Sequence, residues 1–126
     1  MLSVVNLSAA LRSVDAFWQP RVVGAINDFH VKVVRLQGEF LWHHHDTEDE
    51  LFLVVNGTLH MHYRDDAGAE EVAIVRSGEF IVVPHGTEHK PVAEGEVDVL
   101  LLEPATTLNT GNVVNERTYV DPNAAH

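Results

Sequence analysis

The sequence predicts an all-β sandwich or barrel with a short helical segment at its N-terminus. The chain has 126 residues, of which 45% are hydrophobic and 21% charged, so it is about one domain long and can bury one core. From Arg21 onward, short runs rich in β-branched residues alternate with turn residues such as Asn-Gly and Pro-His-Gly. Eight such runs within about 80 residues are typical of sandwiches and barrels.

The elements are expected in the following order. Residues 6–14 form a short helix capped by Asn6 or Ser8, too short to be stable without packing. Asn56-Gly57 lies between two apolar runs and predicts a hairpin, because both residues tolerate positive φ. We expect one domain over 1–126, with a barrel core at about 22–104 and an irregular tail at 105–126 whose last residues are loose. The expected strands cover residues 22–26, 30–36, 40–45, 51–55, 58–63, 71–75, 80–84 and 97–103.

The composition excludes several classes of function. Nineteen acidic residues against eight basic ones give a net charge of -11, which disfavours nucleic-acid and membrane partners. Without cysteine, a metal could be held only by His, Asp or Glu. The N-terminus lacks the charged region and continuous apolar stretch of a secretory signal, and no run approaches the roughly 18 apolar residues of a membrane span. We therefore expect a soluble, cytoplasmic protein.

Histidine is the anomaly: the chain has nine, and five lie between residues 43 and 62. In a strand, His43 and His45 share one face, and two imidazoles on one face can converge on one ion. Glu50 opens the next strand, and His89 follows a turn that returns it toward the interior. Three imidazoles and one carboxylate suit a divalent first-row metal.

Two spaced patterns resemble the two motifs of the cupin superfamily, and the similarity extends over about residues 22–118. They are Gly38-x4-His43-x-His45-x4-Glu50-x6-Gly57 and Gly78-x5-Pro84-x-Gly86-x2-His89. The resemblance implies a cupin-type double-stranded β-helix, or jelly-roll barrel, in which the residues matching His43, His45, Glu50 and His89 bind a metal. The sequence departs from the family at two positions. The spacing between Gly38 and His43 is one residue shorter than is common, and Ala93 stands where the family usually has Asn. Neither position is a ligand.

The more specific resemblance is to small bacterial cupins described as mannose-6-phosphate-isomerase-like, a label that gives no evidence of that activity. We expect one divalent transition metal, Fe, Mn, Ni or Zn, and a small-molecule substrate or ligand. The first hypothesis is a metal-dependent enzyme acting inside the barrel, of dioxygenase or isomerase type, with catalytic residues unknown. The alternatives are a non-catalytic metal-containing binding or sensing protein, and a barrel with a fortuitous ion.

Several polar residues keep open interpretations. His44 is expected to point outward and His85 to lie exposed in a turn, while His60 and His62 face solvent unless the strand parity is reversed. The carboxylate ligand could instead be one of Asp46, Glu48 and Asp49. His30 and His126 carry no functional signal. The sequence leaves open which cations enter the cavity; the candidates are Lys32, Arg35, Arg64 and Lys90. It also leaves open which acid or base enters the cavity; the candidates are Glu39, His60, His62, Glu79 and Lys90.

A homodimer is expected because some strands are apolar on both faces. Residues 51–55 and 80–84 do not alternate, and Phe40 and Trp42 are expected on the face opposite His43. Two-fold symmetry is the commonest way to cover such a surface. The competing expectation is that the segment before Val22 covers the same face within one chain, through Leu7, Leu11, Phe17 and Trp18.

Overall fold

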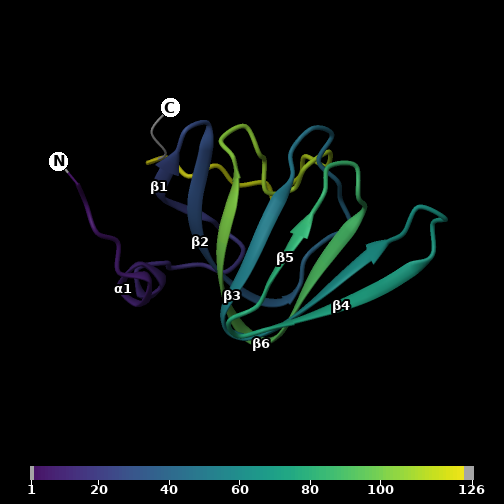
Figure 1. Ribbon diagram of the computed structural model, residues 1–126, viewed down its shortest axis with the longest axis horizontal. Coiled ribbons are helices and arrows are strands. Elements are labelled where there is room, and N and C mark those ends of the chain that lie inside the picture. The colour runs from purple at the N-terminus through teal and green to yellow at the C-terminus, as the bar shows by residue number, and fades with distance from the viewer. Residues whose placement is uncertain (1, 124–126) are drawn as a thin grey trace.

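One antiparallel sheet bends into a barrel in this protein, as Figure 1 shows. The computed structural model describes residues 2–123. The strands are ordered β1-β2-β6-β3-β4, and β5 pairs with β3. This arrangement confirms the predicted all-β barrel with one short N-terminal helix. The elements are α1 (Leu7–Arg12), β1 (Arg21–Ile26), β2 (Phe29–Glu39), β3 (Glu50–Arg64), β4 (Glu70–Arg76), β5 (Phe80–Val83) and β6 (His89–Pro104).

Two long strands, β3 and β6, each take part in two regions of the sheet. The first part of β3 pairs with β5 and its second part with β4, while β6 runs beside both parts. The predicted hairpin at Asn56-Gly57 is therefore wrong. Gly57 has φ +97, and a Cβ there would lie 2.8 Å from the backbone oxygen of Glu96. The glycine allows a bend within β3, where its register against β6 shifts.

The expected strand at 40–45 is also wrong. With 51–55 and 58–63 joined in β3, the described residues form six strands instead of the expected eight. The register between β2 and β6 shifts at Gln37 and Gly38, and Gly38 has φ +70. After β2 ends, His43 makes only an isolated bridge with His89. The residues between β2 and β3 thus form a loop that crosses one end of the barrel.

The segment before β1 splits between two places. The Asn6 side chain accepts a hydrogen bond from the Ala9 amide at 2.9 Å and so caps α1, as predicted. Leu11 packs against Val33 on the outer face of β2, which supports the expectation of cover within one chain for that part of the face. Trp18 instead turns inward and packs against the barrel core.

The barrel core lies between the two curved halves of the sheet. Phe40 is buried and stacks on Trp18 with ring centroids 4.8 Å apart, so the expectation that Phe40 faces outward is wrong. The strand parity behind that expectation fails because residues 40–42 are not in a strand. The Arg64 guanidinium lies over the Trp42 side chain, 4.2 Å from the centroid of the Trp42 ring. The buried cluster comprises Val34, Leu36, Phe52, Val54, Leu59, Met61, Val75, Val83, Ala93, Val97, Val99 and Leu101.

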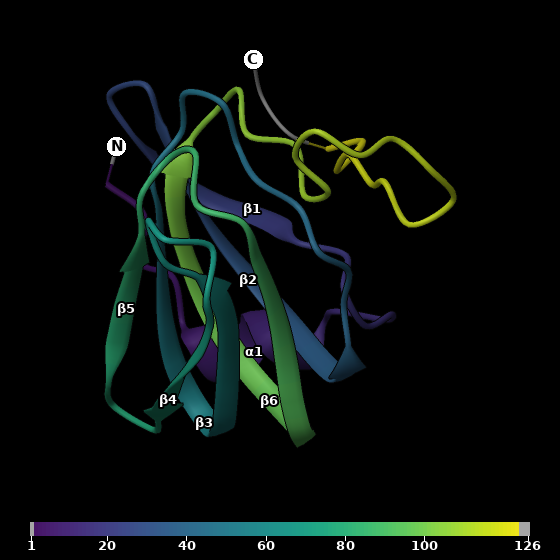
Figure 2. The same ribbon diagram turned by 90° about the vertical axis from the view of Figure 1, so that its right-hand side faces the viewer.

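The irregular tail after β6, yellow in Figure 2, returns to the loop between β2 and β3. The Asn112 amide donates to the His44 carbonyl at 2.9 Å, and the His44 amide donates to Asn112 Oδ1 at 2.8 Å. The tail is irregular, as predicted, but its described part is held in place by these contacts. His126 and the other last residues lie outside the described range. No helix among residues 2–123 is long and apolar enough to cross a membrane.

Candidate metal centre

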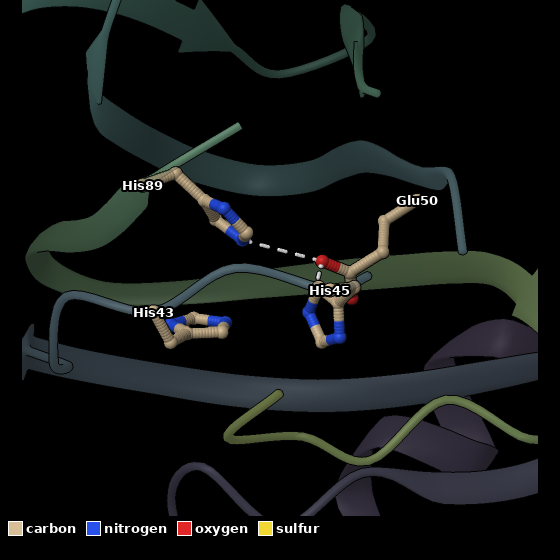
Figure 3. Close-up of side chains that lie close together, drawn as sticks. All are labelled: His43, His45, Glu50 and His89. Carbon is tan, nitrogen blue, oxygen red and sulfur yellow. Dashed lines mark ion pairs between the residues drawn. The ribbon is translucent and has the colours of Figure 1, made fainter. Parts of the chain in front are cut away.

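The four predicted ligands meet inside one end of the barrel. His43 and His45 lie in the loop after β2, Glu50 begins β3, and His89 begins β6. One ligand atom from each of the four lies within 4.8 Å of the others. Figure 3 shows the imidazoles and the carboxylate converging from these separate segments.

Backbone carbonyls orient two of the imidazoles. His43 Nδ1 lies 2.9 Å from the Leu41 oxygen, and His89 Nδ1 lies 2.8 Å from the Thr87 oxygen. Because a carbonyl can only accept, Nδ1 carries the proton in each ring. The lone pair of each Nε2 is therefore available to an ion, the arrangement that metal-binding histidines commonly show.

The donor set fits a divalent cation. All four side chains are buried, and His89 is fully excluded from solvent. His45 Nε2 lies 2.8 Å and His89 Nε2 3.3 Å from Glu50 Oε1, yet none of these three atoms has a partner with hydrogen-bond geometry. Buried polar atoms without partners are costly. An ion bound by all of them would remove that cost.

A second carboxyl group, Glu103, lies beside Glu50 at the end of β6. Burial opposes ionisation of Glu50, but Glu103, His45 and His89 outweigh it and hold the pKa of Glu50 well below its usual range. Burial and the charge of Glu50 together raise the pKa of Glu103 well above its usual range, although Lys32 Nζ lies only 2.8 Å from Glu103 Oε1. Glu50 is thus the charged carboxylate and Glu103 the one that retains a proton.

His43 is also adapted to remain neutral. Burial, followed by the proximity of His89, lowers the pKa of His43 from 6.5 to about 4. Only a neutral imidazole can bind a metal. Protons therefore compete weakly for His43 in mildly acidic solution.

A small cavity of about 40 Å³ opens beside His43, Glu50 and Glu103. Its walls are mainly apolar, and the stacked rings of Trp18 and Phe40 form one side. The Phe40 ring also meets His43 edge-on, with centroids 5.5 Å apart. A molecule of a few heavy atoms in this cavity would touch both the candidate metal site and a proton-bearing carboxyl.

A larger hollow of about 390 Å³ lies between β3, β4 and β5, and its floor includes Met61 and Ile81. Tyr63 and Val83, which line it, are the cross-strand partners of His89 and Glu50. None of the four candidate ligands lines this hollow itself. The smaller cavity, which His43 and Glu50 line, is the one that leaves space for a small molecule next to them.

The other residues near the predicted motif face away from the centre. Asp46 and Asp49 are exposed and Glu48 is half-buried, so Glu50 is the buried carboxylate of this segment. His44 points outward to Glu88 and Asp46, at 2.8 and 2.9 Å. The remaining expectations hold as well: His60 and His62 lie on the outward face of β3, and His85 pairs with Asp49 in a turn.

Of the four cations left open by the sequence, only Lys32 enters the barrel, where Glu103 holds it. Arg35 pairs with acidic side chains on the outside, and both Arg64 and Lys90 lie over Trp42. None of the expected acid or base candidates lines the smaller cavity. Sequence reasoning missed Glu103, although the alternation through Val97, Val99 and Leu101 in VDVLLLE places it on the inward face.

Comparisons with known proteins place the chain. A family model described as "Cupin domain" matches residues 31–104. The uncharacterized protein YdbB of Bacillus subtilis (strain 168) is 31% identical over 90 residues, which are 71% of this chain and 76% of that protein. A cupin-2 domain containing protein from Shewanella frigidimarina NCIMB 400 superimposes with a TM-score of 0.74 and 38% identity, over 80% of this chain and 94% of that one.

One enzyme of known reaction shares the fold. Hydroquinone 1,2-dioxygenase from Sphingomonas sp. TTNP3, in complex with 4-nitrophenol, superimposes with a TM-score of 0.73 and 20% identity. The match covers 82% of this chain but only 33% of that one. At this identity the likeness concerns the fold alone.

Proposed function

Because this chain belongs to the cupin domain family and brings three buried histidines and a glutamate together, we propose that it is a metal-dependent enzyme acting on a small organic molecule inside the barrel. His43, His45, Glu50 and His89 hold the ion. The observation that carries the proposal is the convergence of their ligand atoms within 4.8 Å, in a buried site where several lack hydrogen-bond partners.

The metal is one of Fe, Mn, Ni and Zn, which all suit nitrogen and oxygen ligands. Such an ion supplies Lewis-acid chemistry, and a redox-active one also supports chemistry with dioxygen. Iron would favour a dioxygenase, a class of enzyme represented among the proteins that share this fold by a hydroquinone 1,2-dioxygenase. Zinc would favour an isomerase-type reaction.

The chain's own residues supply the rest of the chemistry. Trp18 and Phe40 form an apolar wall that orients a small molecule and excludes water from the cavity. Glu103 is 1% exposed, and the carboxyl oxygen that carries its proton lies against the Glu50 carboxylate. We assign to this oxygen the transfer of a proton to or from the bound molecule, with Lys32 holding the carboxyl in position.

Metal content of matched variants tests the site. His45→Gln should lose most of the metal, whereas His44→Gln, the neighbouring histidine that faces outward, should keep it. Both variants should stay folded, because the barrel has its own core. If His45→Gln retained stoichiometric metal, the assignment would be wrong.

A second experiment separates catalysis from binding. The iron-loaded protein is tested for oxygen uptake with small phenols, and the zinc-loaded protein for isomerisation of small sugars by NMR. Turnover that falls in Glu103→Gln while metal content is unchanged supports the enzyme. Saturable binding of such molecules without turnover supports the alternative, a non-catalytic binding or sensing protein, which the larger hollow favours by its volume of about 390 Å³.

Three further expectations accompany this proposal. We propose that residues 1–126 form one domain, that the protein acts in the cytoplasm, and that it forms a homodimer. Limited proteolysis tests the single domain, cell fractionation tests the location, and size-exclusion chromatography tests the homodimer.

A further inference from the structure

The cavity beside the candidate metal centre is lined partly by strands and partly by connecting segments. Four apolar side chains come from the barrel strands: Val34, Leu36, Phe52 and Leu101. Trp18 and Pro20, from the segment before β1, and Asn109, from the tail after β6, also line it. A substitution in a connecting segment can therefore change the size of the cavity without altering the strands that carry Glu50 and His89.

Trp18 is held in this lining by its backbone and by its ring. Its amide donates to the Arg35 carbonyl at 2.9 Å, and its indole Nε1 donates to the Gln37 carbonyl at 2.8 Å. The ring stacks on Phe40 with centroids 4.8 Å apart. The Arg117 guanidinium lies over both rings, 5.6 Å from the Trp18 centroid and 4.7 Å from the Phe40 centroid. The indole cannot rotate away without losing these contacts, so it is a fixed part of the wall.

The backbone of Trp18 adopts a conformation that a large side chain disfavours. Its φ is 64, in the left-handed region that suits glycine and asparagine. Among the residues that the structure describes, only Trp18 and Asn27 adopt such a φ without being glycine. A strained residue of this kind persists only where its surroundings fix it, and such residues cluster at active sites and ligand sites. The contacts of Trp18 therefore hold the indole in the cavity wall against the preference of its own backbone.

Trp18 reaches the candidate metal centre through Phe40. The Phe40 ring stacks on Trp18 on one side and meets His43 edge-on, with centroids 5.5 Å apart. The hydrogen bonds of Trp18 end on β2, which carries none of the four candidate ligands. Replacing Trp18 should therefore remove one part of the cavity wall and leave the candidate ligands in place.

We propose that Trp18 sets the upper size of the molecule that reaches the metal centre, so that only a compact apolar molecule fits beside it. This inference rests on the proposed function, because it concerns the molecule bound in the same cavity. With the indole in place, the cavity has a volume of only about 40 Å³. Removal of a buried ring leaves a gap where the surroundings do not collapse, and here the gap would extend the cavity by the space of the indole.

Trp18→Gly tests the size limit, because glycine removes the indole and suits the left-handed backbone. The proteins are loaded with Co²⁺ and titrated with phenol and with 4-phenylphenol, and binding is followed by the visible absorption of the cobalt ion. The wild type should bind phenol more tightly than 4-phenylphenol. Trp18→Gly should bind 4-phenylphenol about tenfold more tightly than the wild type or more, while the affinity for phenol changes much less.

Phe17→Gly is the matched control. Phe17 precedes Trp18 in the same segment, but its ring lies 5.8 Å from the Arg35 guanidinium and does not line the cavity. This variant loosens the segment without opening the wall, so it should bind 4-phenylphenol as the wild type does. Equal affinities for 4-phenylphenol in the wild type and Trp18→Gly would overturn the proposal. An equal gain of affinity in Phe17→Gly and Trp18→Gly would overturn it too.

Indole itself provides a test that needs no metal. An apolar gap that stays open binds an apolar ring of matching shape. Metal-free Trp18→Gly should therefore bind indole saturably in calorimetry, whereas the wild type and Phe17→Gly should not. Indole should also restore the weak binding of 4-phenylphenol by cobalt-loaded Trp18→Gly. If metal-free Trp18→Gly did not bind indole, Trp18 would not be the fixed wall that the proposal requires.

The metal-free test also separates this proposal from the proposed function. A protein that binds no cobalt, but whose Trp18→Gly variant binds indole, would contradict the metal centre and leave the role of Trp18 in the cavity standing. Stoichiometric cobalt with an unchanged size limit would do the reverse. Circular dichroism checks that each variant is folded. Trp18→Asn replaces Trp18→Gly if the latter is not, because asparagine is smaller than tryptophan and tolerates the left-handed region.

Discussion

Gly111→Ala should damage the candidate metal centre from a residue that contacts no metal. Gly111 lies in the tail with φ +56, in the left-handed region. A Cβ there would overlap the backbone oxygen of His44, and would approach His44 C to 2.9 Å and His43 Cδ2 to 3.1 Å. Because most of these atoms belong to the backbone, no side-chain rotation relieves the overlap. The tail must move away from the loop that carries His43.

The size of the effect follows from what that movement breaks. An alanine in the left-handed region costs about 1 kcal/mol by itself. Displacing the tail loses the two hydrogen bonds between Asn112 and His44, at about 1 kcal/mol each. The free energy of unfolding should therefore fall by about 3 kcal/mol. The affinity for zinc should fall about tenfold or more, as for other losses of support behind a ligand.

Gly95→Ala is the matched control. Gly95 has φ +66, and a Cβ there would meet no atom within 4 Å. This variant should lose only about 1 kcal/mol and keep its affinity for zinc. Urea unfolding of the metal-free proteins and titration with zinc measure both quantities. Equal losses of stability in the two variants, with the same affinity for zinc, would refute the idea that the tail supports the centre.

Three further predictions concern stability without metal. Since the pKa of His43 falls from 6.5 to about 4 on folding, only the unfolded chain gains a proton there as pH falls through that range. The free energy of unfolding should drop by roughly 3 kcal/mol as a result, and His43→Gln should remove that part of the pH dependence. Lys32→Met removes the cation beside Glu103. The free energy of unfolding should fall more in alkaline than in mildly acidic solution, because Glu103 can retain a proton only in mildly acidic solution. Equal losses at the two pH values would contradict this. Gly57→Ala should cost about 2 kcal/mol or more, since φ is +97 and Glu96 blocks the added methyl group; a thermal melt like that of the wild type would exclude the proposed bend.

The sequence was sufficient to predict which side chains gather at the centre, because ligand chemistry depends on residue type and short-range spacing. His43 and His45 converge with Glu50 and His89 although residues 40–45 are a loop instead of the expected strand. The family resemblance indicated the four candidate ligands together. That prediction depended on the spacing of residues within each motif and not on the secondary structure around them.

What failed depended on pairing between distant strands. Asn56-Gly57 has the chemistry of a hairpin, but β6 runs beside both neighbouring segments and keeps them in one strand. Trp18 enters the barrel with φ 64, a backbone conformation that no local pattern signals for tryptophan. Glu103 could have been found from the alternation along its strand, whereas its pairing with Lys32 depends on the packing of β2 against β6.

Crystals of the protein loaded with iron or zinc, with diffraction data collected across the absorption edge of that metal, test the central claim most directly. We expect one anomalous peak per chain, within about 2.0–2.2 Å of one nitrogen from each of His43, His45 and His89 and of a Glu50 oxygen. A peak at other side chains, or no peak in protein loaded with the metal, would contradict the account.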